Sequence, residues 1–282
     1  MPTATVRRRS FVAVTVVLAV ALPAVQAAGT VNAQPDVSPD AAHPQRAHAR
    51  APLLLPNARA LAANKLYIAD GRAGERVLRF ESGLANTGKG VLEVRPNQNG
   101  NCRPKQQHAS QILFRDRNRN GRFDRAVDNR VVRRDTGCMV FHPSHDHWHF
   151  EAAARYALWD PDRAREPVIV KSRKMSFCLR DTERVPDRWP TPDYAQHYGD
   201  CHQHSPQGIS IGWVDIYGSY LPGQSLRLPG AMPDDVYCLR TTVDPKDQLR
   251  ESDNADNHSL RAVRIRGERL SIKPTRRCHA VG

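Results

Sequence analysis

The chain has 282 residues, with 42 lysines and arginines against 29 aspartates and glutamates, and a formal net charge of +13. The positive charge is scattered, and no stacking motif or basic helix accompanies it, so we expect weak attraction to polyanions but no specific nucleic-acid binding. No stretch repeats at a fixed period, and the length suits one sizeable domain.

The N-terminus has the pattern of an export signal. Three arginines at 7–9 precede an apolar run over residues 11–25, which ends near small residues at Ala27 and Ala28. Residues 1–27 are therefore predicted to be a Sec-type signal peptide. The run is short for the ~20 residues of a membrane span, which argues against an uncleaved anchor. We expect a secreted, extracellular protein with no membrane contact after cleavage.

The next segment, residues 28–55, is rich in Ala, Pro, His and Arg and lacks periodicity and aromatic residues. Such a segment cannot bury enough apolar surface to fold, so we predict a disordered linker. A single folded domain is then expected over residues 56–282.

Extended patterns dominate this domain. Strands are predicted at residues 75–80 and 90–95, joined by a turn-rich loop, and at 147–150, 156–159, 174–179, 235–240 and 259–266. Proline is frequent between these runs, and no long amphipathic helix is evident. We therefore predict an all-β fold, a sandwich or irregular barrel with long loops and little helix.

Six cysteines, at 102, 138, 178, 201, 238 and 278, match an exported protein with three disulfides. Six cysteines allow fifteen pairings, and the sequence does not choose among them. The order along the chain offers Cys102–Cys138, Cys178–Cys201 and Cys238–Cys278 as the simplest set.

The segment His142-Pro-Ser-His145-Asp-His147-Trp-His149 is the strongest chemical signal. Alternate residues of a strand share one face, so His145, His147 and His149 are predicted to converge on one metal ion. His142 falls on the wrong parity, and we expect it to be at most a weak fourth ligand. A surface histidine cluster without function is the alternative.

Three histidine ligands leave a coordination position open, which favours catalysis over a purely structural role. Imidazole suits zinc, copper, iron and nickel alike. The residues by themselves leave two further hypotheses open: a three-histidine zinc hydrolase and a non-catalytic copper-binding extracellular module.

A candidate calcium loop precedes the histidines. Asp116, Asn118, Asn120 and Asp124 follow the opening of an EF-hand-type loop, with Gly121 at the turn. The usual glutamate at position 12 is absent, since Val127 stands there, so a plain Asx-rich turn is the alternative.

Four motifs in order resemble those of the lysyl oxidase family, in a bacterial-type form with fewer cysteines than animal members. The histidine segment resembles the family's copper-binding H-x-x-H-x-H-x-H. The others are Lys174-Met-Ser-Phe-Cys-Leu-Arg-Asp181, Gln207-Gly-Ile-Ser-Ile-Gly-Trp-Val-Asp-Ile-Tyr217 and Glu251-Ser-Asp-Asn-Ala-Asp-Asn257. Residues before about 140 match only loosely, and Asp256 stands where the family has asparagine.

The resemblance implies a copper-dependent amine oxidase that uses molecular oxygen and a lysine tyrosylquinone. By position, Lys174 and Tyr217 match the quinone precursors, with Lys171 and Tyr220 as neighbours at the wrong spacing. Asp181 matches a candidate general base. The substrate would be a primary amine or a lysine-containing protein or peptide. The resemblance also supports the Cys178–Cys201 pairing.

The last motif is a second candidate calcium site. Glu251, Asp253, Asp256 and Asn257 crowd acidic and amide oxygens into one short loop. Relatives of lysyl oxidase can bind calcium at the matching loop, and a cation would relieve the repulsion between these carboxylates.

Overall fold

The computed structural model describes residues 50–97, 102–162, 168–172 and 175–281. The predicted signal peptide, residues 28–49 of the predicted linker and Lys174 lie outside these ranges. Within them the regular secondary structure is almost entirely β, which confirms the predicted fold class. The only helical segments described are the short 3₁₀ turns η1 (Arg72–Gly74) and η2 (Thr275–Val281). None of the described helices is long and apolar enough to cross a membrane.

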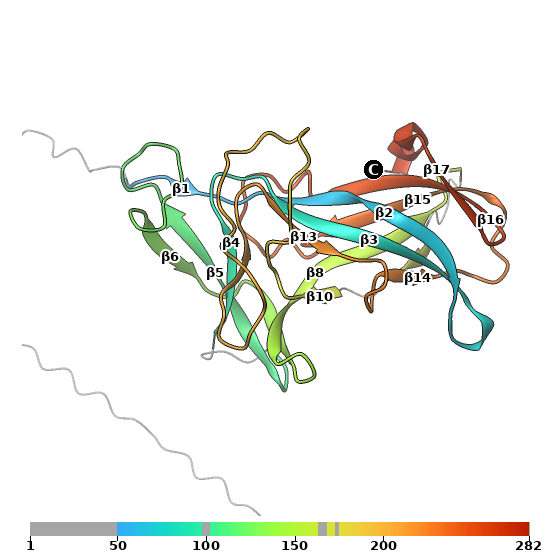
Figure 1. Cartoon of the computed structure of the whole chain (residues 1–282), viewed down its shortest axis with the longest axis horizontal. Helices are drawn as coiled ribbons and strands as arrows, with labels where there is room; N and C mark the ends of the chain where they lie inside the picture. The colour runs from blue at the N-terminus through green and yellow to red at the C-terminus, as the bar shows by residue number, and fades with distance from the viewer. Residues whose placement is uncertain (1–49, 98–101, 163–167, 173–174, 282) are drawn as a thin grey trace, which may run out of the picture. The chain divides into compact units, whose positions relative to one another are not determined.

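Two antiparallel sheets form the domain (Figure 1). The strands of the larger sheet are β1 (Leu53–Leu54), β4 (Leu92–Asn97), β5 (Gln106–Arg115), β6 (Asn129–Arg133), β7 (Cys138–His142), β8 (His147–Trp159), β9 (Val168–Lys171), β10 (Met175–Phe177), β12 (Gln207–Ile209), β15 (Asp235–Val243), β16 (His258–Arg266) and β17 (Arg269–Lys273). Its central path runs β12-β4-β5-β7-β8-β15-β16-β17, with β9 and β10 both paired to β8.

The smaller sheet has the order β11-β13-β3-β14, with β2 also paired to β3. Its strands are β2 (Ala58–Asp70), β3 (Arg76–Asn86), β11 (Glu183–Arg184), β13 (Trp213–Tyr217) and β14 (Ser225–Arg227). Neither sheet closes into a barrel, so the sandwich alternative is the correct one.

The hydrophobic core fills the space between the sheets. Leu78, Phe80 and Leu84 of β3 belong to one buried cluster with Phe150, Tyr156 and Leu158 of β8 and residues of β15 and β16. The Phe80 and Tyr156 rings meet edge to face at 4.7 Å. The Tyr156 hydroxyl also bonds Ser82 Oγ at 2.7 Å and accepts from Gln224 Nε2 at 2.9 Å. This buried polar group is therefore satisfied across the two sheets.

The strand predictions were right in type but incomplete in extent. Residues 147–150 and 156–159 belong to one strand, β8, in which Ala152 has a φ of 61°. Residues 75–80 and 90–95 lie in β3 and β4, which belong to different sheets rather than to one hairpin. The long strand β2 was missed because its alanine-rich sequence carries little β-propensity.

The predicted linker boundary was wrong. Leu53 and Leu54 pair with Arg115 and Phe114 of β5, and Leu54 is buried. A two-residue strand has no periodicity to detect, so the fold starts earlier than residue 56. The simplest disulfide set is confirmed: Cys102–Cys138, Cys178–Cys201 and Cys238–Cys278, with Cα–Cα separations of 6.0, 6.3 and 5.7 Å.

Candidate active site

A β-hairpin presents the histidine cluster. Strands β7 and β8 pair antiparallel, with Val140 opposite His149 and His142 opposite His147. Residues directly opposite each other in such a pair point to the same face. His147 and His149 share that face because they are two residues apart. The turn at residues 143–146, where Asp146 has a φ of 53°, carries His145 back over the same face.

The predicted trio of histidines does converge. One ring nitrogen from each of His145, His147 and His149 lies within 4.8 Å of the other two. The Nε2 atoms of His147 and His149 are 3.0 Å apart. Two nitrogens bound to one ion at ~2.0 Å would be separated by about 2.8–3.3 Å for bond angles between square and tetrahedral. The His147–His149 spacing therefore fits a metal ion.

The parity argument was wrong for His142 and for part of the trio. His145 lies in the turn rather than on the strand, and His142 lies on β7, across from His147. The His142 ring stacks on the His145 ring at 4.2 Å and lies 5.2 Å from the His149 ring. Counting alternate residues along one strand does not predict which face His142 points to, because the chain reverses direction between His142 and His147. His142 thus borders the cluster, with Nδ1 3.0 Å from Ser144 Oγ.

Burial keeps the inner histidines neutral. Desolvation lowers the pKa of His149 to about 4 and also lowers the pKa of His147. The charges of the neighbouring histidines act in the same direction, although a backbone hydrogen bond at His145 raises the pKa of His147. Neutral imidazole is the form that binds a metal. The buried Nδ1 of His147 has no hydrogen-bond partner in the structure. A donor set of neutral imidazoles suits an imidazole-preferring ion.

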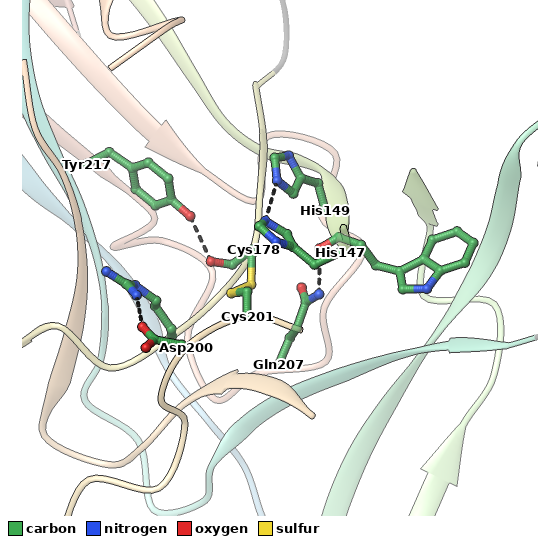
Figure 2. Close-up of a disulfide and its surroundings, with 9 residues drawn as sticks. His147, His149, Cys178, Asp200, Cys201, Gln207 and Tyr217 are labelled. Carbon is green, nitrogen blue, oxygen red and sulfur yellow. Dashed lines mark hydrogen bonds and ion pairs between the residues drawn. A yellow bond between two sulfur atoms is a disulfide. The ribbon is translucent and has the colours of Figure 1, made fainter. Parts of the chain in front are cut away.

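The histidines open into a cavity of about 1250 Å³. Its wall includes all four histidines, the Cys178–Cys201 disulfide, Tyr217 and the apolar side chains Met175, Phe177, Leu221 and Pro222. In Figure 2 the disulfide lies between Tyr217 and the His147–His149 pair. The two predicted centres of chemistry, the metal cluster and Tyr217, therefore share one cavity.

Tyr217 is held from two sides. Its hydroxyl donates to the backbone oxygen of Cys178 at 2.8 Å (Figure 2). Its ring stacks on Phe177 with the centroids 3.7 Å apart. Tyr220, the neighbour at the wrong spacing, is 78% exposed and does not line the cavity.

The lysine prediction falls partly outside the structure. Lys174 is not among the described residues, but Ser172 and Met175, on either side of it, both line the cavity. Lys171 ends β9 opposite Ala157 and is exposed, and it is not part of the cavity wall.

Asp181 is buried and saturated with hydrogen bonds. Its carboxylate accepts from the backbone N–H groups of His197, Tyr198 and Ser210 at 2.7–3.0 Å, and from the Ser210 hydroxyl at 2.7 Å. It does not line the cavity. These contacts tie the segment at residues 197–198 to the segment that follows β12.

Asp215 is the acidic residue beside Tyr217, and the sequence analysis assigned it no role. It is 1% exposed, and its Oδ2 has no hydrogen-bond partner in the structure. Burial raises its pKa well above the ordinary value, although the Tyr217 hydroxyl and the N–H of Arg180 act in the opposite direction. Burial and the Asp215 charge in turn raise the pKa of Tyr217. The i, i+2 spacing of Asp215 and Tyr217 on one strand was the available signal.

In the first candidate calcium loop, the side-chain oxygens accept hydrogen bonds from backbone N–H groups of the same loop. Asp116 accepts from the N–H groups of Asn120 and Gly121 at 3.1 and 2.7 Å, and Asp124 accepts from Ala126 N–H. Asp128 bonds the N–H groups of Arg117 and Asp124. Asn118 and Asn120 make similar short-range bonds. Such bonds are those of Asx turns, so the geometry favours the plain turn.

The second candidate calcium loop contacts the start of β2. Glu251 accepts from Ala58 N–H and from Asn257 Nδ2 at 2.5 and 2.7 Å. Asp256 pairs with Arg59 at 3.2 Å, while Asp253 bonds Ala255 N–H. No three carboxylates among the described residues of either loop bring ligand oxygens within 4.8 Å of one another. Calcium binding at both loops stays a prediction.

Comparison with known proteins gives one consistent result. The chain is 28% identical over 132 residues to "Lysyl oxidase homolog 2" of Gallus gallus, which covers 46% of this chain and 16% of the relative. It is 26% identical over 141 residues to "Lysyl oxidase homolog 3" of Homo sapiens, which covers 50% and 17%. The chain thus spans about a sixth of the length of these relatives. The family model "Lysyl oxidase" matches residues 101–275, more than half of the chain. The chain belongs to the lysyl oxidase family.

Proposed function

We propose that this protein is an exported, copper-dependent amine oxidase of protein-lysine 6-oxidase type. It would convert a primary amine, or a peptidyl lysine, into an aldehyde. One O₂ and one water would be consumed, and one ammonia and one H₂O₂ released, so the two electrons taken from the amine carbon reduce oxygen. The observation that carries the proposal is the shared cavity of the three-histidine cluster and Tyr217.

Copper and a quinone derived from Lys174 and Tyr217 would supply the two-electron acceptor that ordinary side chains lack. His145, His147 and His149 would hold the metal as neutral imidazoles, with His142 beside them. Copper is chosen over zinc because of the family and because Tyr217 lies in the same cavity. A three-histidine zinc hydrolase would need no such tyrosine.

The remaining residues position groups and handle protons. Phe177 and the Cys178 carbonyl fix the ring and hydroxyl of Tyr217. Phe177, Met175 and Leu221 give the cavity an apolar wall, which favours the neutral form of a bound amine. We propose Asp215 rather than Asp181 as the carboxyl that exchanges a proton beside Tyr217, because Asp181 already has four donors whereas Asp215 Oδ2 has none.

Export is supported by the signal-like residues 1–27 and by the three disulfides, since disulfides persist in oxidising compartments. Residues 50–55 belong to the folded domain, which leaves residues 28–49 as the proposed linker.

The test is an amine-dependent peroxide assay on the protein loaded with copper or with zinc. The proposal predicts equal amounts of peroxide and ammonia from a primary amine with copper, and none with zinc. Hydrolysis of an ester or amide by the zinc-loaded protein, without peroxide from the copper-loaded protein, would contradict it. A mass spectrum of the digested protein tests the lysine. A Lys174→Arg variant should lack a cross-linked peptide because a guanidinium is not deprotonated, whereas Lys171→Arg should keep it.

A further inference from the structure

The outer surface of the larger sheet is strongly basic. Alternation along a strand places side chains at every second residue on this outer face, opposite to the core residues Tyr237, Leu239, Val263 and Ile265. The outward positions carry Arg155, Arg240, Arg264, Arg266, Arg269 and Lys273, and these six residues are called the basic face. They come from β8, β15, β16 and β17, which are neighbours in the sheet (Figure 1).

The strand register sets the extent of the basic face. Arg266 lies directly opposite Arg269 at one end of the β16–β17 pair, and Lys273 lies opposite Ala262 farther along. On the other side Arg240 lies opposite Ala157, and Arg155 lies opposite Thr242. From Arg266 to the level of Arg155 the sheet runs about 26 Å, at ~3.3 Å per residue. The cations thus form an extended track rather than a single point.

The basic face lacks compensating acids. Among the described residues, none of its six members makes an ion pair. The stretches of the four strands that carry them, residues 155–159, 236–242, 260–266 and 269–273, hold no aspartate or glutamate, and Glu151 lies farther along β8. The buried Nε atoms of Arg240 and Arg264 have no hydrogen-bond partner. Acidic residues lie in turns at the ends of the sheet, where Glu268 pairs with Arg76 and Asp244 accepts two backbone N–H groups.

The C-terminal turn adds to the same surface. The disulfide from Cys238 to Cys278 fixes η2 over the outward residues of β15 and β16. Arg276 and Arg277 of η2 are both exposed. At the opposite edge Lys171 lies in register with Ala157 and Arg240, and the next residue, Ser172, lines the active-site cavity. Lys171 thus extends the row of cations to the edge strand β9.

We propose that the basic face binds a linear anionic polysaccharide bearing sulfate or carboxylate groups. Guanidinium groups match such oxyanions in a two-point geometry, and an extended row of them suits an extended polymer. Single-stranded nucleic acid is disfavoured because its binding uses aromatic stacking platforms. The outward strand positions offer one aromatic residue, Trp159, which Arg240 already approaches at 6.0 Å. Binding of this kind needs neither metal nor quinone, so it stands apart from the proposed function.

The test measures binding of fluorescent dextran sulfate to the metal-free full chain, with uncharged dextran as the blank. Wild-type protein should bind the sulfated polymer, with an affinity that falls as salt rises. The variant Arg266→Glu/Arg269→Glu/Arg277→Glu changes exposed side chains only and should lose about tenfold or more in affinity, since each site changes by two charges.

The matched control is Arg117→Glu/Arg122→Glu/Arg130→Glu, at exposed positions outside the basic face and with the same change in net charge. It should stay within about twofold of wild type, since salt screens charges beyond a Debye length. Thermal melting would check that both variants are folded. Equal losses in the two variants would mean that net charge alone acts, and would overturn the proposal. So would absence of binding, or tighter binding of single-stranded DNA with the same number of charges.

Discussion

The Tyr217 ring lies on the Phe177 ring with the centroids 3.7 Å apart and the planes 17° from parallel. This contact joins β13 of the smaller sheet to β10 of the larger one. The position of Tyr217 therefore depends on how the two sheets pack, and Phe177 also belongs to the main core.

The Phe177→Leu variant should keep an apolar core but lose the stacked ring, at a cost of about 0.5–1.5 kcal/mol for the aromatic pair. We expect a lower melting temperature and a weaker quinone absorbance per copper, because the Tyr217 ring is less well held. Phe141→Leu is the control, since Phe141 packs on Trp148 outside the cavity. A full quinone band in Phe177→Leu would show that the stack does not position Tyr217.

Tyr217→Phe should retain copper and fold but lose amine oxidation entirely, because the phenolic oxygen needed for a quinone is gone. The lost hydrogen bond to the Cys178 carbonyl should cost about 1 kcal/mol of unfolding free energy. Copper content, melting temperature and peroxide release are the readouts. Tyr220→Phe, at an exposed position, should behave as wild type. Turnover by Tyr217→Phe would refute the assignment of the tyrosine.

Asp215→Asn and Asp181→Asn should fail in different ways. Because burial raises the pKa of Asp215, its contribution to stability is full below the ordinary value of 3.8 and is lost as pH rises toward the folded-state pKa. Asp215→Asn should therefore flatten the pH dependence of the melting temperature while lowering amine turnover.

Asp181→Asn should instead lose stability, by about 1–3 kcal/mol, because an amide cannot accept all four donors. Turnover per folded molecule should stay near wild type. The reverse pattern, with Asp215→Asn fully active and Asp181→Asn folded but inactive, would restore Asp181 as the base.

Glu251 gives a pH test of the second candidate calcium loop. Burial raises its pKa from 4.5 to about 7. Without calcium, its contribution to the free energy of unfolding is therefore full below about pH 4.5 and is lost as pH rises through 7. Glu251→Gln should remove this pH dependence from melting temperatures measured over a range of pH in a chelating buffer. If calcium binds here, adding it above pH 7 should raise the melting temperature of wild type and not of the variant. No response to calcium would reject the site.

Gly208 should not tolerate a side chain. A Cβ at this position would lie 2.3 Å from the backbone oxygen of Leu92 and 2.8 Å from the Tyr198 ring. Gly208→Ala should cost about 1–3 kcal/mol of unfolding free energy, measured by denaturant titration. Gly199→Ala, which meets no atom within 4 Å, is the matched control. Equal stability of the two variants would contradict the register of β12 against β4.

The sequence predicted what depends on short spacing and missed what depends on long-range pairing. The spacing of His147 and His149 along β8 predicted that they share a face, whereas the places of His145 and His142 depended on the turn and on the β7–β8 register. Asp181 was predicted to be a general base from a motif alone. The groups that donate hydrogen bonds to it lie 16–29 positions away in sequence, so the motif did not reveal them. Lys174 lies outside the described residues, so its role stays a prediction.

The most direct test of the account is the visible spectrum of the copper-loaded, secreted protein before and after phenylhydrazine. A quinone band that phenylhydrazine shifts, together with amine-dependent peroxide that the reagent abolishes, is the predicted result. A colourless protein that binds metal tightly at His145, His147 and His149, ignores phenylhydrazine and releases no peroxide would contradict it.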